Sequence, residues 1–305
     1  MMTKADGTMG EPAVIAIDWG TTRFRAYLVG KAGTLLATVS SDEGISSAAA
    51  SDFSQILAAR CGEWLAQFPQ VPVLMAGMIG SRNGWKEVPY VVCPATAAEI
   101  IAGIQKVSIS PGRAAGIVPG LIWHDEGVAD VIRGEETKIV GTGLESGVAI
   151  LPGTHCKWAR IAKGQVTEFR TYMTGEFYGL LRDHSVLKLL AKEPETSSGF
   201  TRGLAATARA GGLLHQAFEA RTSVLDAKMS GSEVGPFLSG LLIGHEVRSA
   251  LDPAGRPQKV TVVAEGVVAQ NYAEALKRET VEAVIVSPQA CFAAGTLRLV
   301  PDWLR

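Results

Sequence analysis

The sequence predicts a mixed α/β protein made of two similar lobes, and two observations support this prediction. First, apolar runs of strand length alternate with amphipathic stretches of helix length along the 305 residues. Second, the order of these elements in residues 13–145 starts again near residue 146. The composition, with 47% hydrophobic residues, supplies enough apolar side chains for two cores.

The first half follows a polar lead-in, residues 1–12, which we expect to be disordered. Its first strands are joined by the turn Gly-Lys-Ala-Gly, and Asp52 can cap the first helix. Later apolar runs are separated by glycine-rich loops, as expected for strand ends. The predicted elements are strands at 14–18, 23–29 and 35–40, a helix at 52–68, a strand at 71–76, a helix at 96–105, a strand at 115–118 and a connecting helix at about 128–140.

The second half repeats this order, with a longer helical stretch inside it. We expect the N-terminal lobe to span residues 13–145 and the C-terminal, nucleotide-binding lobe to span 146–287, with a helical insertion at about 192–258. The C-terminal helix, 288–305, is expected to pack back on the first lobe. The predicted elements are strands at 147–151, 157–162 and 165–171, a helix at 174–191, a helical region at 201–251, a strand at 259–264, a helix at 267–277, a strand at 283–286 and a helix at 289–299.

The two halves can be aligned at an offset of 133 residues. Ile15-Ala16-Ile17 then lies over Val148-Ala149-Ile150, and Gly20-Thr21 lies over Gly153-Thr154. Each half reads βββαβαβα. A duplicated α/β unit of this kind predicts two lobes with a cleft between them.

The stretch IAIDWGTTRFRAYLVG, residues 15–30, places Asp18 at the end of an apolar strand, where an uncompensated carboxylate would be costly. A magnesium ion is one compensation, because Mg²⁺ uses few carboxylates. The turn residues Gly20, Thr21 and Thr22 offer amides and hydroxyls that suit phosphate oxygens. The alternative is a plain hairpin turn. Leu151 lies opposite Asp18 in the repeat, so only the first turn can supply a carboxylate.

The composition excludes several classes of protein. The chain has 29 basic and 30 acidic residues, so nothing indicates nucleic acid as a partner. The sequence contains no run of about 18 apolar residues, so we expect no membrane span. The cysteines are Cys61, Cys93, Cys156 and Cys291, with no C-x-x-C pair, so neither a zinc site nor a disulfide framework is expected. We therefore expect a cytoplasmic protein.

Two segments resemble a known superfamily. IAIDWGTTRFRAYL is similar to the first phosphate segment of the sugar kinase, heat-shock protein 70 and actin superfamily, and LPGTHCKWARIAKGQV is similar to the second. More narrowly, GMIGSRNGWKEVPYVVCPA, DVIRGEETKIVG and LPGTHCKWARIAKGQVTEFRTYMTGEFYGLLRDHS resemble the 2-dehydro-3-deoxygalactonokinase family. The resemblance runs from about residue 13 to the C-terminus. Cys156 stands where we would more readily expect serine.

The resemblance implies a fold and a reaction. The fold would be that of the actin-like ATPases, with two ribonuclease-H-like lobes that close over a nucleotide. The reaction would use ATP and Mg²⁺ to phosphorylate the 6-hydroxyl of 2-dehydro-3-deoxy-D-galactonate. The products would be ADP and 2-dehydro-3-deoxy-6-phosphogalactonate, in the catabolism of galactonate.

Such a reaction needs a base for the attacking hydroxyl. Asp130, Glu135 and Glu136 are the candidates, and Glu135 is preferred because the superfamily's acidic residue often follows a glycine, here Gly134. Asp130 remains open as the base. Glu135 and Glu136 would point about 100° apart on a helix, so at most one faces the cleft. The alternative is a solvated helical face.

The sugar acid carries a carboxylate, which favours a basic group in its site. The loop GSRNGWKEVPY offers Arg82, Asn83, Trp85 and Lys86 as substrate-binding candidates, although it could be an ordinary exposed loop. Arg23, which follows the first turn, could reach substrate or phosphate, or pair at a strand edge.

The second turn supplies Gly153 and Thr154 for the phosphates, with His155 and Lys157 as further candidates. The helix that begins near Thr174 could favour an anion, or Thr174 could be a plain N-cap. In the superfamily a glycine-containing junction lines the adenine. Glu265 and Gly266 are the expected contacts here, and GLLIGHE, residues 240–246, ranks second because its glycines more often mean helix packing.

Three other functions stay open. The chain could phosphorylate another 2-keto-3-deoxy sugar acid, such as the gluconate-derived epimer. It could be a nucleotide-binding regulator of the same fold, although the polar substrate loop argues against that. It could also hydrolyse phosphate bonds with water as acceptor. The helical insertion has room for a homodimer contact or a lid.

Overall fold

The computed structural model describes residues 10–47, 52–192, 198–251 and 256–305. The chain divides into two compact units. The first unit comprises Met1–Ser146, Ile161–Glu168 and Ser287–Arg305, and the second comprises Gly147–Arg160 and Phe169–Val286.

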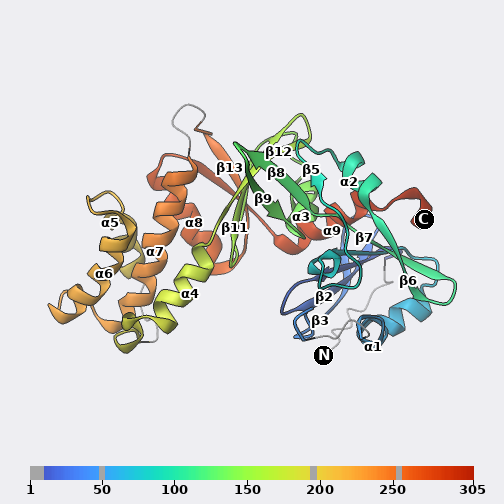
Figure 1. Cartoon of the computed structure of the whole chain (residues 1–305), viewed down its shortest axis with the longest axis horizontal. Coiled ribbons are helices and arrows are strands. Elements are labelled where there is room, and N and C mark those ends of the chain that lie inside the picture. Colours follow the sequence, from blue (N-terminus) through green and yellow to red (C-terminus); the bar gives the residue numbers. More distant parts are fainter. Residues whose placement is uncertain (1–9, 48–51, 193–197, 252–255) are drawn as a thin grey trace. The chain divides into compact units, whose positions relative to one another are not determined.

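The first unit is built on a six-stranded mixed sheet (Figure 1). Its first three strands form an antiparallel meander, and the next strands along the sheet run parallel to β1. Because β1 lies in the middle of the sheet, its residues from Val14 to Trp19 are all buried. The strands, in sheet order, are β3 (Leu35–Ser41), β2 (Phe24–Gly30), β1 (Pro12–Trp19), β4 (Val73–Gly77), β7 (Arg113–Ile117) and β6 (Gln105–Ser110).

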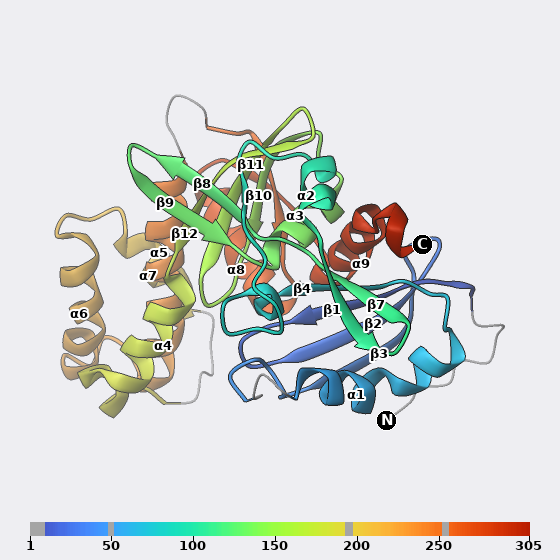
Figure 2. The same cartoon turned by 45° about the vertical axis from the view of Figure 1, so that its right-hand side comes forward.

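Helices cover both faces of this sheet (Figure 2). On one face, α1 (Phe53–Gln67) packs Phe53 and Leu57 into the cluster around Ile17. On the other face, α9 (Pro288–Leu299) places Phe292 5.7 Å from the ring of Tyr27. α9 also crosses α3 (Glu135–Thr142) at glycines, which allow the two backbones to touch. Short α2 (Ala97–Gly103) begins with a capping box, and η1 (Met78–Gly80) follows β4.

A small third sheet corrects one element of the sequence prediction. It consists of β5 (Val91–Val92), β8 (Leu121–Asp125) and β9 (Val128–Ile132). The predicted connecting helix at about 128–140 is therefore wrong in its first part: residues 128–132 form a strand, and the helix begins at Glu135. Val128, Val131 and Ile132 fit both a helical and a strand pattern, and Gly134, with φ of 108°, separates the two elements.

The second unit contains a five-stranded sheet whose strand order matches that of the first. When the inserted strands β5 and β6 are left out of the count, both sheets run third, second, first, fourth, fifth in the order of strands in each half, and the first sheet adds β6 at its edge. The duplicated βββαβαβα pattern is confirmed, with β5, β6, β8, β9 and extra helices as insertions. The strands, in sheet order, are β12 (Gln165–Tyr172), β11 (Cys156–Ala162), β10 (Ser146–Leu151), β13 (Lys259–Val263) and β14 (Glu282–Val286).

Helices dominate the rest of the second unit (Figure 1). The sheet packs against α5 (Ser198–Ala206), α7 (Gly231–Ala250) and α8 (Gly266–Arg278). α4 (Thr174–His184), η2 (Val186–Leu189) and α6 (Gly212–Leu225) join α5 and α7 around a separate apolar cluster. The predicted helix 174–191 is thus broken at Ser185, whose hydroxyl accepts a hydrogen bond from the Leu187 N–H. A last turn, η3 (Asp302–Leu304), ends the chain.

In the described ranges, no helix combines the length and apolar character that a membrane crossing requires.

Candidate active site

The first turn is held in shape by backbone hydrogen bonds. The Gly20 N–H donates to the carbonyl of Arg23 at 2.8 Å, and Thr21, Thr22 and Arg23 are exposed. Thr21 and Thr22 are therefore both accessible at the surface.

Residues 44–46 hold this turn through backbone hydrogen bonds. Their N–H groups donate to the carbonyls of Thr22, Gly20 and Thr21 at 3.0–3.2 Å. A side chain at Gly44 would overlap the backbone of Thr21 and Thr22, so this position requires glycine. Gly44 is not evident from the sequence, because no local pattern links it to a turn more than 20 residues away.

Asp18 lies next to the turn and is buried, with 8% of its surface exposed. Its Oδ2 atom lies 3.1 Å from Nζ of Lys138 and 3.5 Å from a guanidinium nitrogen of Arg25. Burial by itself would lower the pKa of Lys138, but the charges of Asp18 and Glu135 outweigh this, and the pKa lies above its ordinary value. Lys138 therefore stays charged and compensates the buried carboxylate.

Three backbone segments meet beside Asp18 because two glycines allow it. A Cβ on Gly77, which has φ of 96°, would lie 2.7 Å from the carbonyl oxygen of Trp19. A Cβ on Gly134 would lie 3.0 Å from Cα of Gly77. The ends of β1 and β4 and the start of α3 are therefore in direct contact, which brings Glu135 and Lys138 to the same place as Asp18.

The structure separates the three candidates for the base. Glu136 is fully buried: its carboxylate accepts hydrogen bonds from Gly134 N–H at 2.6 Å and Thr137 Oγ1 at 3.0 Å. Glu135 is partly exposed, and its Oε2 accepts a hydrogen bond from Arg133 N–H at 3.1 Å. Asp130 lies on β9, not on the helix. Glu135 is thus the more accessible of the two helical carboxylates.

Glu136 has a strongly perturbed carboxyl group. Burial, reinforced by the neighbouring charge of Glu135, raises its pKa to about 7. The hydrogen bonds to the carboxylate oppose this rise without cancelling it.

The predicted substrate loop holds its four candidates in different ways. The side chain of Arg82 is 86% exposed, and its Nε lies 3.9 Å from Oε1 of Glu87. The next residue, Asn83, is also exposed. Trp85 turns inward: it stacks on Phe53 with ring centroids 6.2 Å apart and belongs to the core around it. Trp85 therefore has a packing role that the local sequence does not indicate.

The other basic candidates already have partners. Lys86 donates to the carbonyl oxygen of Lys106 at 3.0 Å. Arg23 lies 3.8 Å from Asp42, and both side chains are largely exposed. Such exposed contacts contribute little, so Arg23 and Arg82 can exchange them for a carboxylate of a substrate.

Arg133 was not identified from the sequence. Its guanidinium donates to Val88 O at 2.9 Å and lies 4.2 Å from the ring centroid of Tyr90. It therefore ties the end of the substrate loop to the residue just before Gly134 and Glu135.

In the second unit, the second turn is exposed from Gly153 to His155. Glu176 N–H, in the first turn of α4, donates to the carbonyl of Thr154 at 3.0 Å. A side chain at Gly175 would overlap the Gly153 carbonyl, so glycine is required for this approach. Nε2 of His155 lies 2.5 Å from Oε2 of Glu176, and buried Lys157 donates to the His155 carbonyl at 2.9 Å. The turn and the N-terminus of α4 therefore form one structure.

A pocket of about 350 Å³ adjoins the second turn. Three helices and the turn supply its walls, which are mainly apolar with a few polar groups, as is usual for a small-molecule site. Its lining residues are Pro152, Gly153, Thr174, Gly175, Tyr178, Ser239, Leu242, Ile243, Val268, Asn271 and Tyr272.

The predicted adenine contacts, Glu265 and Gly266, do not line this pocket, although they closely precede its lining residue Val268 in the sequence. Glu265 is the N-cap of α8, and Gly266 has φ of 61°, a conformation that favours glycine. The residues of α8 that line the pocket begin two positions further along, at Val268. In GLLIGHE, Gly240 serves helix packing, because a side chain there would overlap the Phe200 carbonyl.

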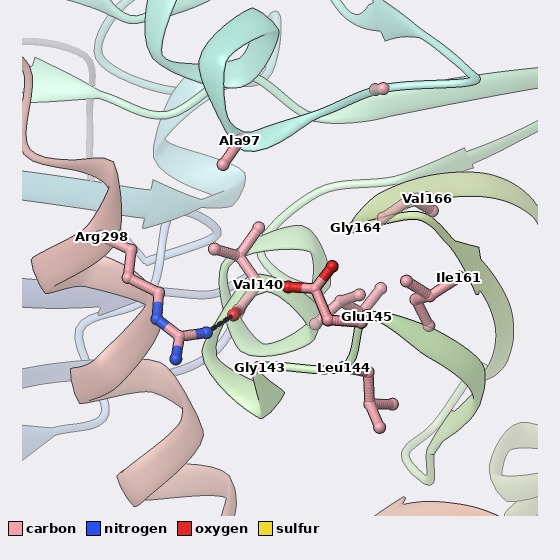
Figure 3. Close-up of a pocket in the computed structure, with 11 residues that line it drawn as sticks. Ala97, Val140, Gly143, Leu144, Glu145, Ile161, Gly164, Val166 and Arg298 are labelled. Carbon is pink, nitrogen blue, oxygen red and sulfur yellow. Dashed lines mark hydrogen bonds between the residues drawn. The ribbon is translucent and has the colours of Figure 1, made fainter.

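A second pocket, of about 280 Å³, lies in the first unit (Figure 3). Arg298 and Glu145 are its charged residues, and Arg298 donates to the Val140 carbonyl at 2.6 Å. It contains none of the residues predicted for the site.

The residues around Asp18 are compatible with a magnesium ion held mainly by phosphates and water. In the described part of the chain, no three acidic, His or Cys side chains gather into a metal cluster. Mg²⁺ does not require one, since it is commonly held by one or two carboxylates together with phosphate oxygens and water. Asp18 can be that carboxylate, although Oδ2 is already engaged by Lys138 and Arg25.

Comparisons with solved structures identify the fold. A crystal structure from Sinorhizobium meliloti, whose description names a 2-dehydro-3-deoxygalactonokinase, has a TM-score of 0.83 at 32% identity and covers 92% of this chain and 96% of its own. Component A of the (R)-2-hydroxyglutaryl-CoA dehydratase from Acidaminococcus fermentans has a TM-score of 0.52 at 14% identity, over 93% and 96%, and shows the fold alone. The fold is that of the actin-like ATPases and sugar kinases, which confirms the predicted fold class.

Sequence comparisons are more specific. The 2-dehydro-3-deoxygalactonokinase of Escherichia coli K12 is 36% identical over 285 residues, covering 92% of this chain and 95% of that protein. A Rhizobium meliloti protein described as a probable 2-dehydro-3-deoxygalactonokinase is 35% identical over 301 residues, covering 92% and 94%. The model of the family described as 2-keto-3-deoxy-galactonokinase matches residues 18–299. The resemblance drawn from the sequence motifs is thus confirmed, and the chain belongs to the 2-keto-3-deoxy-galactonokinase family.

Proposed function

We propose that this protein is an ATP-dependent kinase that phosphorylates the 6-hydroxyl of 2-dehydro-3-deoxy-D-galactonate. The observation that carries the proposal is the accessible Glu135 carboxylate beside the Asp18–Lys138 ion pair, in a chain that belongs to this kinase family. The named activity of the Escherichia coli relative supports the choice of substrate.

In this mechanism Glu135 acts as the general base. Its carboxylate takes the proton of the 6-hydroxyl as that oxygen forms a bond to the γ-phosphorus of ATP. The bond from the γ-phosphorus to the bridging oxygen breaks, and its electron pair stays on ADP. The charged Lys138 keeps Asp18 compensated before and after this step.

The phosphates need donors and counter-charges in their binding site. We assign Gly20, Thr21 and Thr22 of the first turn to this task, together with Gly153, Thr154, His155 and Lys157 of the second. Asp18 would hold Mg²⁺, which supplies charge compensation for the transferred phosphoryl group.

The remaining candidate residues are assigned to the sugar acid and to the nucleoside of ATP. Arg82 and Asn83 are exposed at the tip of the substrate loop, and Arg23 lies beside the first turn. We assign them to the carboxylate and hydroxyls of the sugar acid. Lys86 is a further candidate for the same role. The pocket of the second unit takes the nucleoside of ATP, and we assign Glu265 and Gly266, at the start of the helix α8 that lines it, to the adenine.

An ADP-release assay with purified protein, ATP and Mg²⁺ tests this proposal on a panel of 2-keto-3-deoxy sugar acids. We expect release to require the keto acid, and kcat/KM for the galactonate-derived acid to exceed that for its gluconate-derived epimer by about tenfold or more, because a misplaced hydroxyl leaves polar groups unpaired. Phosphorus NMR should place the phosphate on C6.

Each alternative function predicts a different result. ADP release at the same rate without keto acid would indicate a hydrolase. Nucleotide binding without turnover on any acid would indicate a regulator. Preference for the epimer would keep the kinase and change the substrate.

A further inference from the structure

The second unit contains a buried carboxylate that the proposed reaction does not use. Glu246 lies in α7 and has only 3% of its surface exposed. Trp158 Nε1 donates to its Oε1 at 2.7 Å, and the Tyr272 hydroxyl lies 3.0 and 2.9 Å from its two oxygens. The Thr174 hydroxyl donates to Oε2, and the Cys156 thiol also donates.

These four donors come from three different elements. Trp158 and Cys156 lie on β11, Thr174 begins α4, and Tyr272 lies on α8. Glu246 therefore joins the sheet to three helices through one side chain. All of these donors are neutral, and burial raises the pKa of Glu246. A carboxyl group this costly to bury indicates a role beyond packing, since an apolar residue of similar size would fill the same space.

Two of the four donors also line the nucleotide pocket. Thr174 and Tyr272 form part of its wall, while Glu246 itself does not reach it. Thr174 is followed by Gly175, which contacts the backbone of the second turn. The hydrogen bond from Thr174 to Glu246 therefore fixes the start of α4 against that turn.

We infer that Glu246 is a positioning residue for ATP, which holds Thr174 and Tyr272 in the orientation that shapes the nucleotide pocket and the second phosphate turn. This inference rests on the proposed function, because it takes the pocket to be the nucleotide site. It predicts that loss of the Glu246 carboxylate weakens nucleotide binding selectively.

The test compares Glu246→Leu and Glu246→Gln with the parent chain. Leucine removes every acceptor. Glutamine keeps one carbonyl oxygen for Trp158 and Tyr272, and its amide can donate to Thr174, so it should rescue most of the effect. By calorimetry, we expect the Kd for ADP to rise about tenfold or more in Glu246→Leu, and to stay within about threefold of the parent in Glu246→Gln.

A matched control separates positioning from general stability. Glu233→Gln lies in the same helix and alters a carboxylate that accepts hydrogen bonds from Ser230 and Ser198, away from the pocket. It should lower Tm but leave the Kd for ADP unchanged. In Glu246→Leu, the Kd for the sugar acid measured without nucleotide should stay within about twofold of the parent, since no residue assigned to the sugar acid contacts Glu246.

If Glu246→Leu does not fold, Thr174→Val carries the same test, because it removes one donor to Glu246 and keeps the side chain's shape. We expect it to weaken ADP binding by several-fold. An unchanged Kd for ADP in Glu246→Leu or in Thr174→Val, with the parent binding normally, would overturn the inference and leave the proposed kinase intact. A parent chain that binds no ADP would overturn both.

Discussion

The buried carboxyl of Glu136 should make the stability of the protein depend on pH. Its pKa rises from the ordinary 4.5 to about 7, because the side chain is fully buried and Glu135 lies next to it. Between these two values the folded state holds a proton that the unfolded state has lost. The stabilisation is therefore fully present below pH 4.5 and is lost as the pH rises through about 7.

The size of this effect follows from the two pKa values. Each unit of pKa corresponds to 1.36 kcal/mol, so the full change is about 3 kcal/mol, and about 2 to 3 kcal/mol of it falls between pH 5 and pH 8. Glu136→Gln removes the titrating group while its amide oxygen can still accept from Gly134 N–H. The stability of Glu136→Gln relative to the parent should therefore increase by that amount over this range.

Urea unfolding of both proteins at pH 5, 6, 7 and 8, at constant ionic strength, measures the difference directly. Glu99→Gln is the control, because hydrogen bonds from Thr96 lower the pKa of exposed Glu99 and its stabilisation is lost only as the pH falls below the ordinary value. The difference in the free energy of unfolding between Glu99→Gln and the parent should stay constant above pH 6. If the Glu136→Gln difference is equally constant, Glu136 is ionised, and the N-terminus of α3 outweighs the cost of burial.

Three further predictions concern the site itself. Glu135→Gln should lower kcat by about 10² to 10⁴ with little change in either KM, because it removes the base; near-parental turnover in the ADP-release assay would move that role to Asp130 or elsewhere. Asp18→Asn should raise the Mg²⁺ concentration needed for half-maximal turnover, measured by metal titration, and an unchanged metal dependence would remove Asp18 from the metal site. Gly44→Ala should raise the KM for ATP by about tenfold, since overpacking costs about 1–3 kcal/mol and the new methyl group displaces the first turn. Gly62→Ala in α1, where a Cβ meets nothing within 4 Å, should leave that KM unchanged, and equal effects of the two alanines would contradict a specific role for Gly44.

Much of the fold could be predicted from local patterns. Each strand that was predicted lies within about two residues of its predicted position, because apolar runs of strand length and their glycine turns are local signals, whereas β5, β6, β8 and β9 were not predicted. The wrong prediction of a helix at residues 128–132 has the same origin. A five-residue segment with apolar side chains at its first, fourth and fifth positions fits both the helical and the strand period of hydrophobic residues. Only its pairing with β8 selects the strand.

The candidate site was predicted less completely. Asp18, the two turns and Glu135 are predicted as site residues because each interrupts a local pattern, such as a carboxylate at the end of an apolar strand. No local pattern indicates the role of Lys138, because it pairs with Asp18, 120 residues earlier in the chain. The sequence also does not indicate that Trp85, predicted as a substrate contact, packs against Phe53.

The sequence by itself determined the duplicated order of elements, the two Gly-Thr turns and the membership of the family, since each of these is written in consecutive residues. The tertiary structure alone decided that Glu136 points inward while Glu135 stays accessible, that Gly44 supports the first turn, and that Glu246 joins Thr174 to Tyr272. The physical reason is that burial and hydrogen-bond partners depend on residues brought together from distant parts of the chain, and no local period records that encounter.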